Sequence, residues 1–180
     1  QPRKTLELTA KSIQSMMGET SSSPVLGVSV ALPGIVDEKR GMAVERTLVG
    51  WHDYSVQEHL QALIGLPVFV ANDVKLDTIG EFYFGAGRGV RDLVCLWLED
   101  GIGAGVVMNG QLIRGVSSSA GEIGFNPFFT PNPSISILFD ENARYWGDVL
   151  SFTNFQNSIR RGLAAGWESE LTDDSTVLEF

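Results

Sequence analysis

The first half of the chain alternates between apolar positions at helical spacing and nearly continuous apolar stretches. Spacings of three and four residues predict a helix over Leu6–Met17, ended by Gly18, and a second helix over Val56–Ile64. The continuous stretches predict strands at Val25–Leu32 and Leu66–Ala71, the first of them buried on both faces. Because strands and helices alternate, we expect a parallel α/β sheet.

Two positions are candidate helix caps. Ser55 and Glu58 have the spacing of a capping box, in which each side chain binds a backbone N–H of the other residue. Asp73 follows the second strand and precedes a predicted helix over Val74–Phe84. It can act there as an N-cap, which the residue type alone favours, or as a general base that takes a proton from a substrate hydroxyl. The side chains of this helix that we expect to face inward are Leu76, Ile79 and Phe82 or Tyr83.

From Gly85 onward, turns and short strands replace the alternation of strands and helices. Asn109-Gly110 predicts a tight hairpin, because both residues accept a positive φ. We therefore divide the chain into part of an α/β lobe, residues 1–84, and part of a hairpin-rich lobe, residues 85–180. The later elements predicted are strands at Leu93–Leu98, Ile102–Met108 and Gln111–Arg114, and a helix at Leu150–Ala165.

Composition and charge narrow the class of protein. The 180 residues carry 13 Lys and Arg against 22 Asp and Glu, and the resulting net charge of −9 opposes contact with nucleic acid or anionic lipid. A single cysteine, Cys95, excludes an internal disulfide and a thiolate zinc site. No apolar stretch approaches the ~20 residues of a membrane span. We expect a cytoplasmic protein without a bound metal.

Glycines gather at Gly101, Gly103 and Gly105, between two predicted strands. A dinucleotide fingerprint instead lies between a strand and a helix. Two interpretations remain: a turn that presents backbone N–H groups to nucleotide phosphates, or a tight hairpin with positive φ and no ligand. Glu99 and Asp100 precede the glycines, and a pair of like charges ~4 Å apart costs about 4 kcal/mol at an effective ε of ~20. We therefore expect weak affinity for anions.

Several motifs occur in one order between Val25 and Gly124 and carry a family resemblance. They are Gly27-Val28-Ser29-Val30-Ala31-Leu32-Pro33-Gly34, Ala71-Asn72-Asp73, Gly80-Glu81, Asp100-Gly101-Ile102-Gly103-Ala104-Gly105 and Ala120-Gly121-Glu122-Ile123-Gly124. In them the sequence resembles the ROK family of bacterial repressors, open reading frames and sugar kinases. The resemblance implies an α/β fold of the actin-like, ribonuclease-H-like type, with two lobes and a sugar site between them, present here as a fragment.

The resemblance also implies which residues bind ligand. The implied sugar-binding positions are Gly34, Asn72, Asp73 and Glu122. In a kinase of this family the residue at Asp73 is the catalytic base. A remnant of the phosphate loop is implied at Gly101, Gly103 and Gly105. ATP and magnesium would be cofactors only if the chain is a kinase; otherwise we expect no cofactor.

Three departures from the family's kinases place the chain closer to the sugar-responsive repressors. Glu99-Asp100 makes the phosphate turn acidic, and Lys75 and Asp77 replace an Asn and a small residue after the Asn-Asp pair. Phe125 stands in place of a zinc-binding His, so we do not expect zinc. The aromatic residues expected to fill this space as a core are Phe125, Phe128 and Phe129.

Three functions remain open at this stage. The first is the sugar-sensing effector domain of a ROK-type transcriptional regulator, a homodimer whose DNA-binding helix-turn-helix lies outside this chain. The second is an ATP-dependent hexose kinase, truncated or degenerate, for which we do not expect activity in the chain as given. The third is a dimerisation domain that has lost its ligand.

Overall fold

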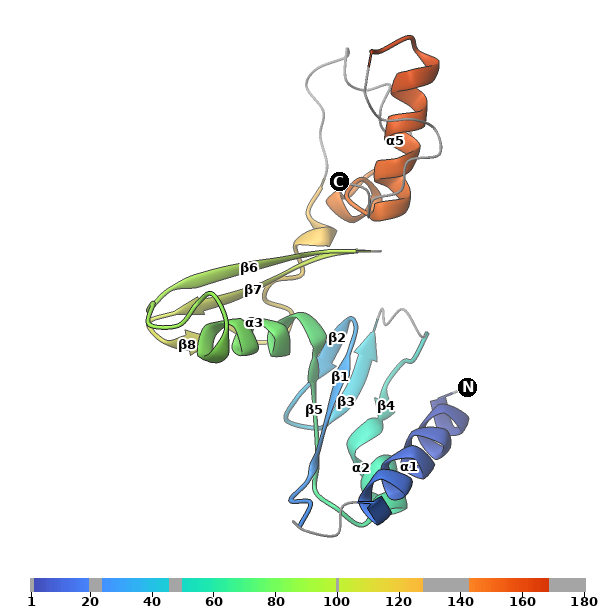
Figure 1. Cartoon of the computed structure of the whole chain (residues 1–180), viewed down its shortest axis with the longest axis vertical. Coiled ribbons are helices and arrows are strands. Elements are labelled where there is room, and N and C mark those ends of the chain that lie inside the picture. The colour runs from blue at the N-terminus through green and yellow to red at the C-terminus, as the bar shows by residue number, and fades with distance from the viewer. Residues whose placement is uncertain (1, 20–23, 46–49, 100, 128–142, 169–180) are drawn as a thin grey trace. The chain divides into compact units, whose positions relative to one another are not determined.

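The computed structural model describes residues 2–19, 24–45, 50–99, 101–127 and 143–168 (Figure 1). Contacts divide the chain into two units, each described here by itself. The first contains Gln1–Leu93 and Val106–Ala120, and the second contains Val94–Gly105 and Gly121–Phe180. The lobe boundary predicted after residue 84 stays a prediction.

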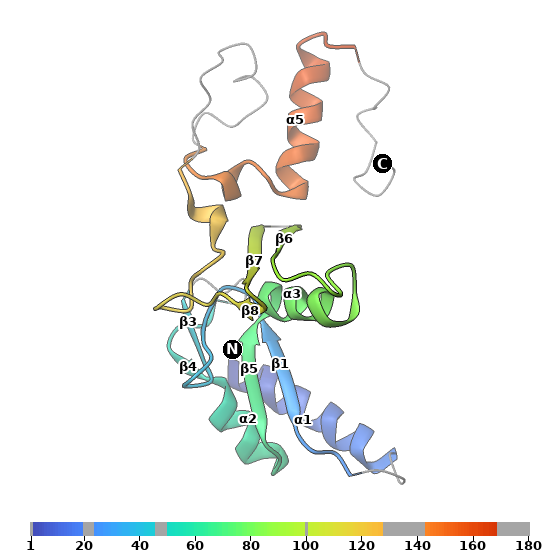
Figure 2. The same ribbon diagram turned by 90° about the vertical axis from the view of Figure 1, so that its left-hand side faces the viewer.

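A parallel pair of strands forms the centre of the first unit. Strand β1 (Val28–Leu32) pairs in parallel with β5 (Val68–Asn72), which confirms the predicted strand–helix alternation. Helices α1 (Pro2–Glu19) and α2 (Val56–Ile64) lie side by side next to this pair (Figure 1 and Figure 2). Helix α2 ends at Gly65 with a φ of 70°, in the left-handed conformation typical of a C-terminal cap.

A small antiparallel sheet belongs to the same unit. Strand β2 (Ile35–Asp37) pairs with β3 (Met42–Glu45), and β3 pairs with β4 (Tyr54–Ser55). The backbone N–H groups of Lys39 and Arg40 both donate to the Asp37 carboxylate, at 3.1 Å each, and this stabilises the turn between β2 and β3.

The second half of the chain contains the predicted hairpin. Helix α3 (Asp73–Phe84) follows β5, and strands β6 (Leu93–Leu98), β7 (Ile102–Met108) and β8 (Gln111–Leu112) then form a sheet in that order. Asn109 and Gly110 connect β7 to β8 with φ values of 53° and 77°, as the sequence predicts. The other elements described are the short helices η1 (Ile123–Phe125) and η2 (Trp146–Asp148) and helix α5 (Phe152–Ala164), which confirms the last predicted helix.

One predicted helix end and one predicted helix cap are wrong. Helix α1 continues through Gly18 to Glu19, since glycine in a helix costs only about 0.5–1 kcal/mol relative to alanine. Ser55 precedes α2 but its side chain makes no capping hydrogen bond. Its backbone pairs with Met42 in the small sheet and has a ψ of 84°, which differs from the extended conformation of most N-cap residues.

Burial also differs from the prediction. Strand β1 is not buried on both faces: Ser29 and Ala31 are exposed, and Phe69 on β5 is 66% exposed. The helices α1 and α2 cover one face of this two-stranded pair, so alternate residues remain on the surface. The side chains of α3 that are buried are Lys75 and Thr78, in its first two turns, rather than the predicted apolar ones.

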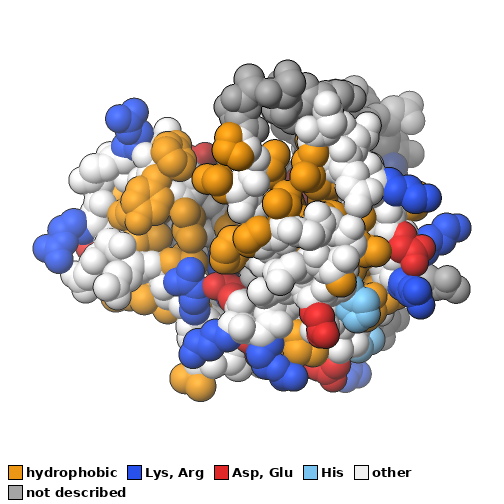
Figure 3. Space-filling model, turned by 90° about the horizontal axis from the view of Figure 1, so that it is seen from below, with side chains coloured by type: hydrophobic (Ala, Val, Ile, Leu, Met, Phe, Trp, Pro, Cys, Tyr) orange, Lys and Arg blue, Asp and Glu red, His pale blue; other side chains and the backbone are white. Residues whose placement is uncertain are grey.

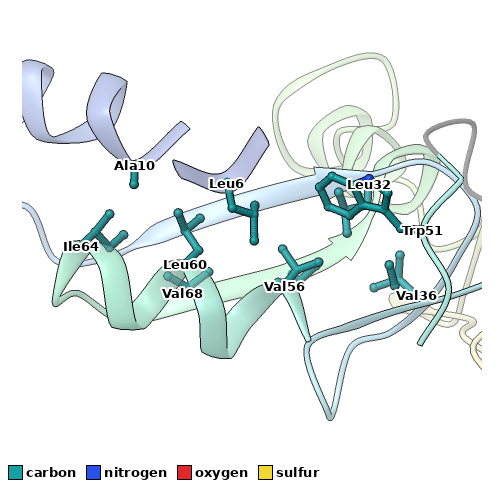
Figure 4. Packing of buried hydrophobic residues seen from close by; sticks show 11 residues of the cluster. Leu6, Ala10, Leu32, Val36, Trp51, Val56, Leu60, Ile64 and Val68 are labelled. Carbon is teal, nitrogen blue, oxygen red and sulfur yellow. The ribbon is translucent and has the colours of Figure 1, made fainter. Parts of the chain in front are cut away.

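The core of the first unit lies between α1, α2 and the two central strands (Figure 4). Leu60 and Val56 from α2 are fully buried, and Leu6 of α1 is 3% exposed. The remaining members are Ala10, Leu32, Val36, Ala43, Trp51, Ile64, Val68 and Val70. The cluster contains five of the apolar positions whose helical spacing predicted α1 and α2, whereas Leu63, another such position, is 41% exposed.

Apolar side chains also occur on the surface. In Figure 3, hydrophobic side chains gather at several places between charged ones. Leu26 and Phe84 are 83% and 85% exposed. Large exposed apolar surfaces are typical of sites that contact other protein. Among the described helices, we find none long and apolar enough to cross a membrane.

Replacing Leu60 by alanine tests this core. Because Leu60 is 0% exposed, we expect Leu60→Ala to lower the free energy of unfolding by about 2–5 kcal/mol in urea denaturation. Leu8→Ala is the matched control, because Leu8 is on α1 and 56% exposed, and it should change stability by less than about 0.5 kcal/mol. Equal losses in the two variants would show that the core is elsewhere.

Candidate functional site

The candidate site begins where the two parallel strands end. Leu32, the last residue of β1, is in register with Asn72, the last residue of β5. Gly34 follows β1 with a φ of 85° and turns the chain toward β2. The carboxyl ends of parallel strands are where open α/β sheets bind ligands. Gly34, Asn72 and Asp73 are therefore brought together at such an edge.

The Asn72 side chain forms hydrogen bonds with three groups, one in the turn after β1 and two at the start of α3. Its Nδ2 donates to the carbonyl oxygen of Gly34 and to Oδ1 of Asp73, both at 3.0 Å. Its Oδ1 accepts from the backbone N–H of Lys75, also at 3.0 Å. An asparagine amide has two N–H donors and two acceptor lone pairs. Both donors of Asn72 are used within the protein, and among the described residues its oxygen accepts one hydrogen bond.

This geometry corrects the prediction that Asp73 caps the helix. The N-cap of α3 is Asn72, whose ψ of 140° is extended and whose side chain accepts from the third residue of the helix. Asp73 is instead the first residue of α3. Its Oδ1 accepts from Asn72 and from the backbone N–H of Val74, at 2.8 Å, and these two donors orient the carboxylate. A carboxylate that is fixed in this way can accept from ligand hydroxyls or act as a base.

Lys75 has a role in this region that the sequence pattern does not predict. Lys75 is 2% exposed, and its ammonium group donates to the carbonyl oxygen of Ser118. A buried ammonium is costly unless hydrogen bonds satisfy it, so this contact is part of the reason that Lys75 can lie inside. No sequence signal pointed to Ser118, which is 43 residues further along the chain.

Glu122 lies in the second unit, and two glycines position it there. A Cβ added at Gly121 would lie 1.7 Å from the carbonyl oxygen of Ala104, and one added at Gly124 would lie 2.8 Å from that of Ile102. The backbone of Gly121 also accepts from the N–H of Ala104, at 2.8 Å. Glu122 is thus held between two residues whose backbone touches β7 too closely for any side chain.

The glycine cluster lies at the turn between β6 and β7 and within β7. Gly103 and Gly105 are within β7, and Gly101 precedes it at a bend. The turn contains Asp100, which lies outside the described residues, so the interpretation as a tight hairpin without a ligand stays a prediction. Gly103 lies between Ile102 and Ala104, whose carbonyls Gly124 and Gly121 approach closely. A phosphate-binding role of this segment stays a prediction.

The expectation that the chain holds no zinc stays a prediction. We find no group of three or more His, Cys, Asp or Glu side chains among the described residues that could hold a metal ion. Phe125, at the position of the zinc-binding His, is 41% exposed, so its predicted place in a core is wrong. Phe128 and Phe129 lie outside the described residues.

The fold is of the actin-like, ribonuclease-H-like α/β type. Its central strands β1 and β5 are parallel, and helices pack next to them. The sequence model of the ROK family matches residues 1–135. The chain therefore belongs to the ROK family.

Relatives within the family include both kinases and repressors. The chain is 35% identical over 104 residues to a glucokinase from Halalkalibacterium halodurans, a match that covers 58% of this chain and 32% of that protein. It is 29% identical over 154 residues to a xylose repressor from Caldicellulosiruptor bescii, which covers 84% of this chain and 36% of that protein. The chain thus spans about a third of the length of these curated relatives.

Solved structures support the fold. A ROK family transcriptional regulator, described as a homologue of the E. coli MLC protein, has a TM-score of 0.78 and 23% identity, over 96% of this chain and 44% of that chain. A ROK family glucokinase from Streptomyces griseus, in complex with glucose and AMPPNP, has a TM-score of 0.67 and 25% identity, over 87% and 50%.

Replacing Gly121 by alanine tests how Glu122 is held. The added methyl group would meet the Ala104 carbonyl oxygen at 1.7 Å, at a φ of 90°. We expect Gly121→Ala to lower the free energy of unfolding by more than about 3 kcal/mol, from overpacking and from the left-handed backbone together.

The matched control is Gly110→Ala, because Gly110 has a φ of 77° but open space around it. It should cost only about 1–2 kcal/mol, the penalty of the left-handed backbone alone. Similar losses for both variants, measured by thermal and urea denaturation, would contradict the close approach of Gly121 to β7.

Proposed function

We propose that this chain is part of the sugar-sensing effector domain of a ROK-type transcriptional regulator. The observation that carries the proposal is the extent of the alignments. The match to the xylose repressor covers 84% of the chain, whereas the match to the glucokinase from Halalkalibacterium halodurans covers 58%. The similarity to a repressor therefore extends over a larger part of this chain than the similarity to this kinase.

The site chemistry suits a sugar. Sugar hydroxyls both donate and accept hydrogen bonds, and carboxylates and amide oxygens accept from them. The Asp73 carboxylate is oriented through Oδ1, and among the described residues Asn72 Oδ1 accepts one of the two hydrogen bonds that an amide oxygen can accept. The Gly34 carbonyl oxygen accepts from the same Asn72 amide. Glu122 lies in the second unit and stays a predicted sugar-binding position.

The chemistry is less suited to phosphoryl transfer. Such catalysis depends on holding the transferred phosphate in line and stabilising its charge. The exposed Glu99 lies two residues before Gly101, on the segment that would contact phosphate, and it repels that charge. ATP and magnesium are therefore not part of this proposal, and neither is zinc.

A regulator of this kind works because its ligand changes the populations of two protein conformations. A sugar that binds one conformation of the protein more tightly than another shifts the balance toward the first. With a net charge of −9, this chain is not itself suited to hold DNA, so the signal would pass to a separate DNA-binding part. A homodimer in the cytoplasm, with a sugar as its small-molecule partner, completes the proposal.

The second candidate is a sugar kinase. It is favoured by Asp73, which lies at the carboxyl end of β5 with its carboxylate oriented by two donors. In a kinase this group would take the proton from the attacking sugar hydroxyl. The 35% identity to a glucokinase supports the same alternative.

Titration calorimetry and an ADP-release assay separate the two candidates. We expect the purified protein to bind at least one sugar from a panel that includes D-xylose and D-glucose, and to release no ADP from ATP and magnesium with any of them. Asp73→Asn should weaken sugar binding about tenfold or more, since it removes a charged hydrogen-bond acceptor.

The outcomes differ clearly between the candidates. ADP release that requires a sugar and disappears in Asp73→Asn would establish the kinase and overturn the proposal. Absence of binding for every sugar, together with a stable dimer in sedimentation, would favour a dimerisation domain. Asp77→Asn is the matched control, because Asp77 is exposed on the same helix and should leave sugar affinity unchanged.

A further inference from the structure

The burial of Lys75 requires an explanation. Its side chain is in the first turn of α3 and is 2% exposed, whereas lysines are almost never fully buried unless they are paired. Its backbone N–H is held by Asn72, the residue that caps the helix. Its ammonium group donates to the carbonyl oxygen of Ser118. The same residue thus contacts the candidate site through its backbone and a distant turn through its side chain.

The turn at Ser118 is held in an unusual conformation. Ser118 has a φ of 58°, which residues other than glycine seldom adopt and which persists only when surrounding contacts determine it. The hydroxyls of Ser117 and Ser119 are hydrogen-bonded to each other. The backbone N–H of Ala120 donates to the carbonyl oxygen of Arg114 at 3.1 Å. The Lys75 ammonium adds a charged hydrogen bond, which is stronger than a neutral one.

The turn lies near the end of the first unit, where the chain passes to the second unit. The first unit ends at Ala120, and the second resumes at Gly121, directly before Glu122. Arg114, at the start of the same segment, is anchored within the first unit by an ion pair of 2.7 Å with Glu38. The segment from Arg114 to Ala120 is therefore held to the first unit at both ends, by the ion pair of Arg114 and by the Lys75 contact to Ser118.

We propose that Lys75 is a positioning residue, which fixes the Ser117–Ser119 turn to the first turn of α3, beside Asn72. The inference rests on the proposed sugar-binding function, because it makes Lys75 a determinant of affinity without direct contact to the sugar. Lys75 is one of the positions that the family resemblance marks as departing from the kinases.

Hydrogen exchange tests the structural half of the inference without any sugar. In Lys75→Met we expect the amide of Ala120 to exchange about tenfold to a hundredfold faster, because the turn loses a charged hydrogen bond. The amide of Gly65, which donates to Gln61 in α2, is the internal control and should not change. Lys75→Arg should restore much of the protection, and Lys11→Met, which removes a charge from an exposed position on α1, should have no effect. If Lys75→Met does not fold, Lys75→Gln replaces it.

Sugar titration tests the functional half. Lys75→Met should raise the sugar dissociation constant about tenfold, and Lys75→Arg should recover part of this loss. An unchanged dissociation constant in Lys75→Met would overturn the effect of Lys75 on the sugar site.

The outcomes separate this inference from the proposed function. Unchanged exchange at Ala120, or faster exchange at Ala120 and Gly65 alike, overturns the positioning role of Lys75, whether or not sugar binds. Faster exchange at Ala120 alone, in a protein that binds no sugar, supports the role of Lys75 in the turn and overturns the proposed function.

Discussion

The side-chain amide of Asn72 connects the segments from which the candidate site is built. It donates to the Gly34 carbonyl from the turn after β1 and to the Asp73 carboxylate, and it accepts from the Lys75 backbone at the start of α3. One buried group thus sets the start of a helix, the position of a turn and the orientation of a carboxylate. Because buried polar groups are costly when unsatisfied, these hydrogen bonds depend on one another. Asp73 can act as a ligand or base only in this setting.

The apolar pattern predicts the two central strands and the helices α1, α2 and α3, because helical spacing and continuous stretches are local properties, but it does not predict the short strands β2, β3 and β4. It is less informative about burial. Phe69 is 66% exposed because the helices cover only one face of the β1–β5 pair, and no local pattern shows how many strands or layers surround a strand. The same reason applies to α3, whose buried side chains are Lys75 and Thr78.

The candidate site could be found from the sequence only in part. The motif containing Asn72 and Asp73 indicated the right place, but both residues are good caps, and the choice between them depends on the Gly34 carbonyl, 38 residues earlier. Lys75 gave no signal of its role, since a lysine in a first helical turn is normally exposed. Its partner Ser118 differs from its neighbours by a positive φ, and a serine in the sequence does not predict that conformation.

The proposed function depends on one central claim, that the amide of Asn72 arranges the groups that would bind a sugar. Sugar titration of Asn72→Asp tests this claim most directly. This variant keeps an acceptor for the Lys75 N–H, so α3 still begins at Asp73, but it loses both donors and places a second negative charge beside Asp73. We expect unchanged helix content by circular dichroism and a sugar affinity at least about tenfold weaker. Equal affinity in the variant and the unaltered protein would contradict the account.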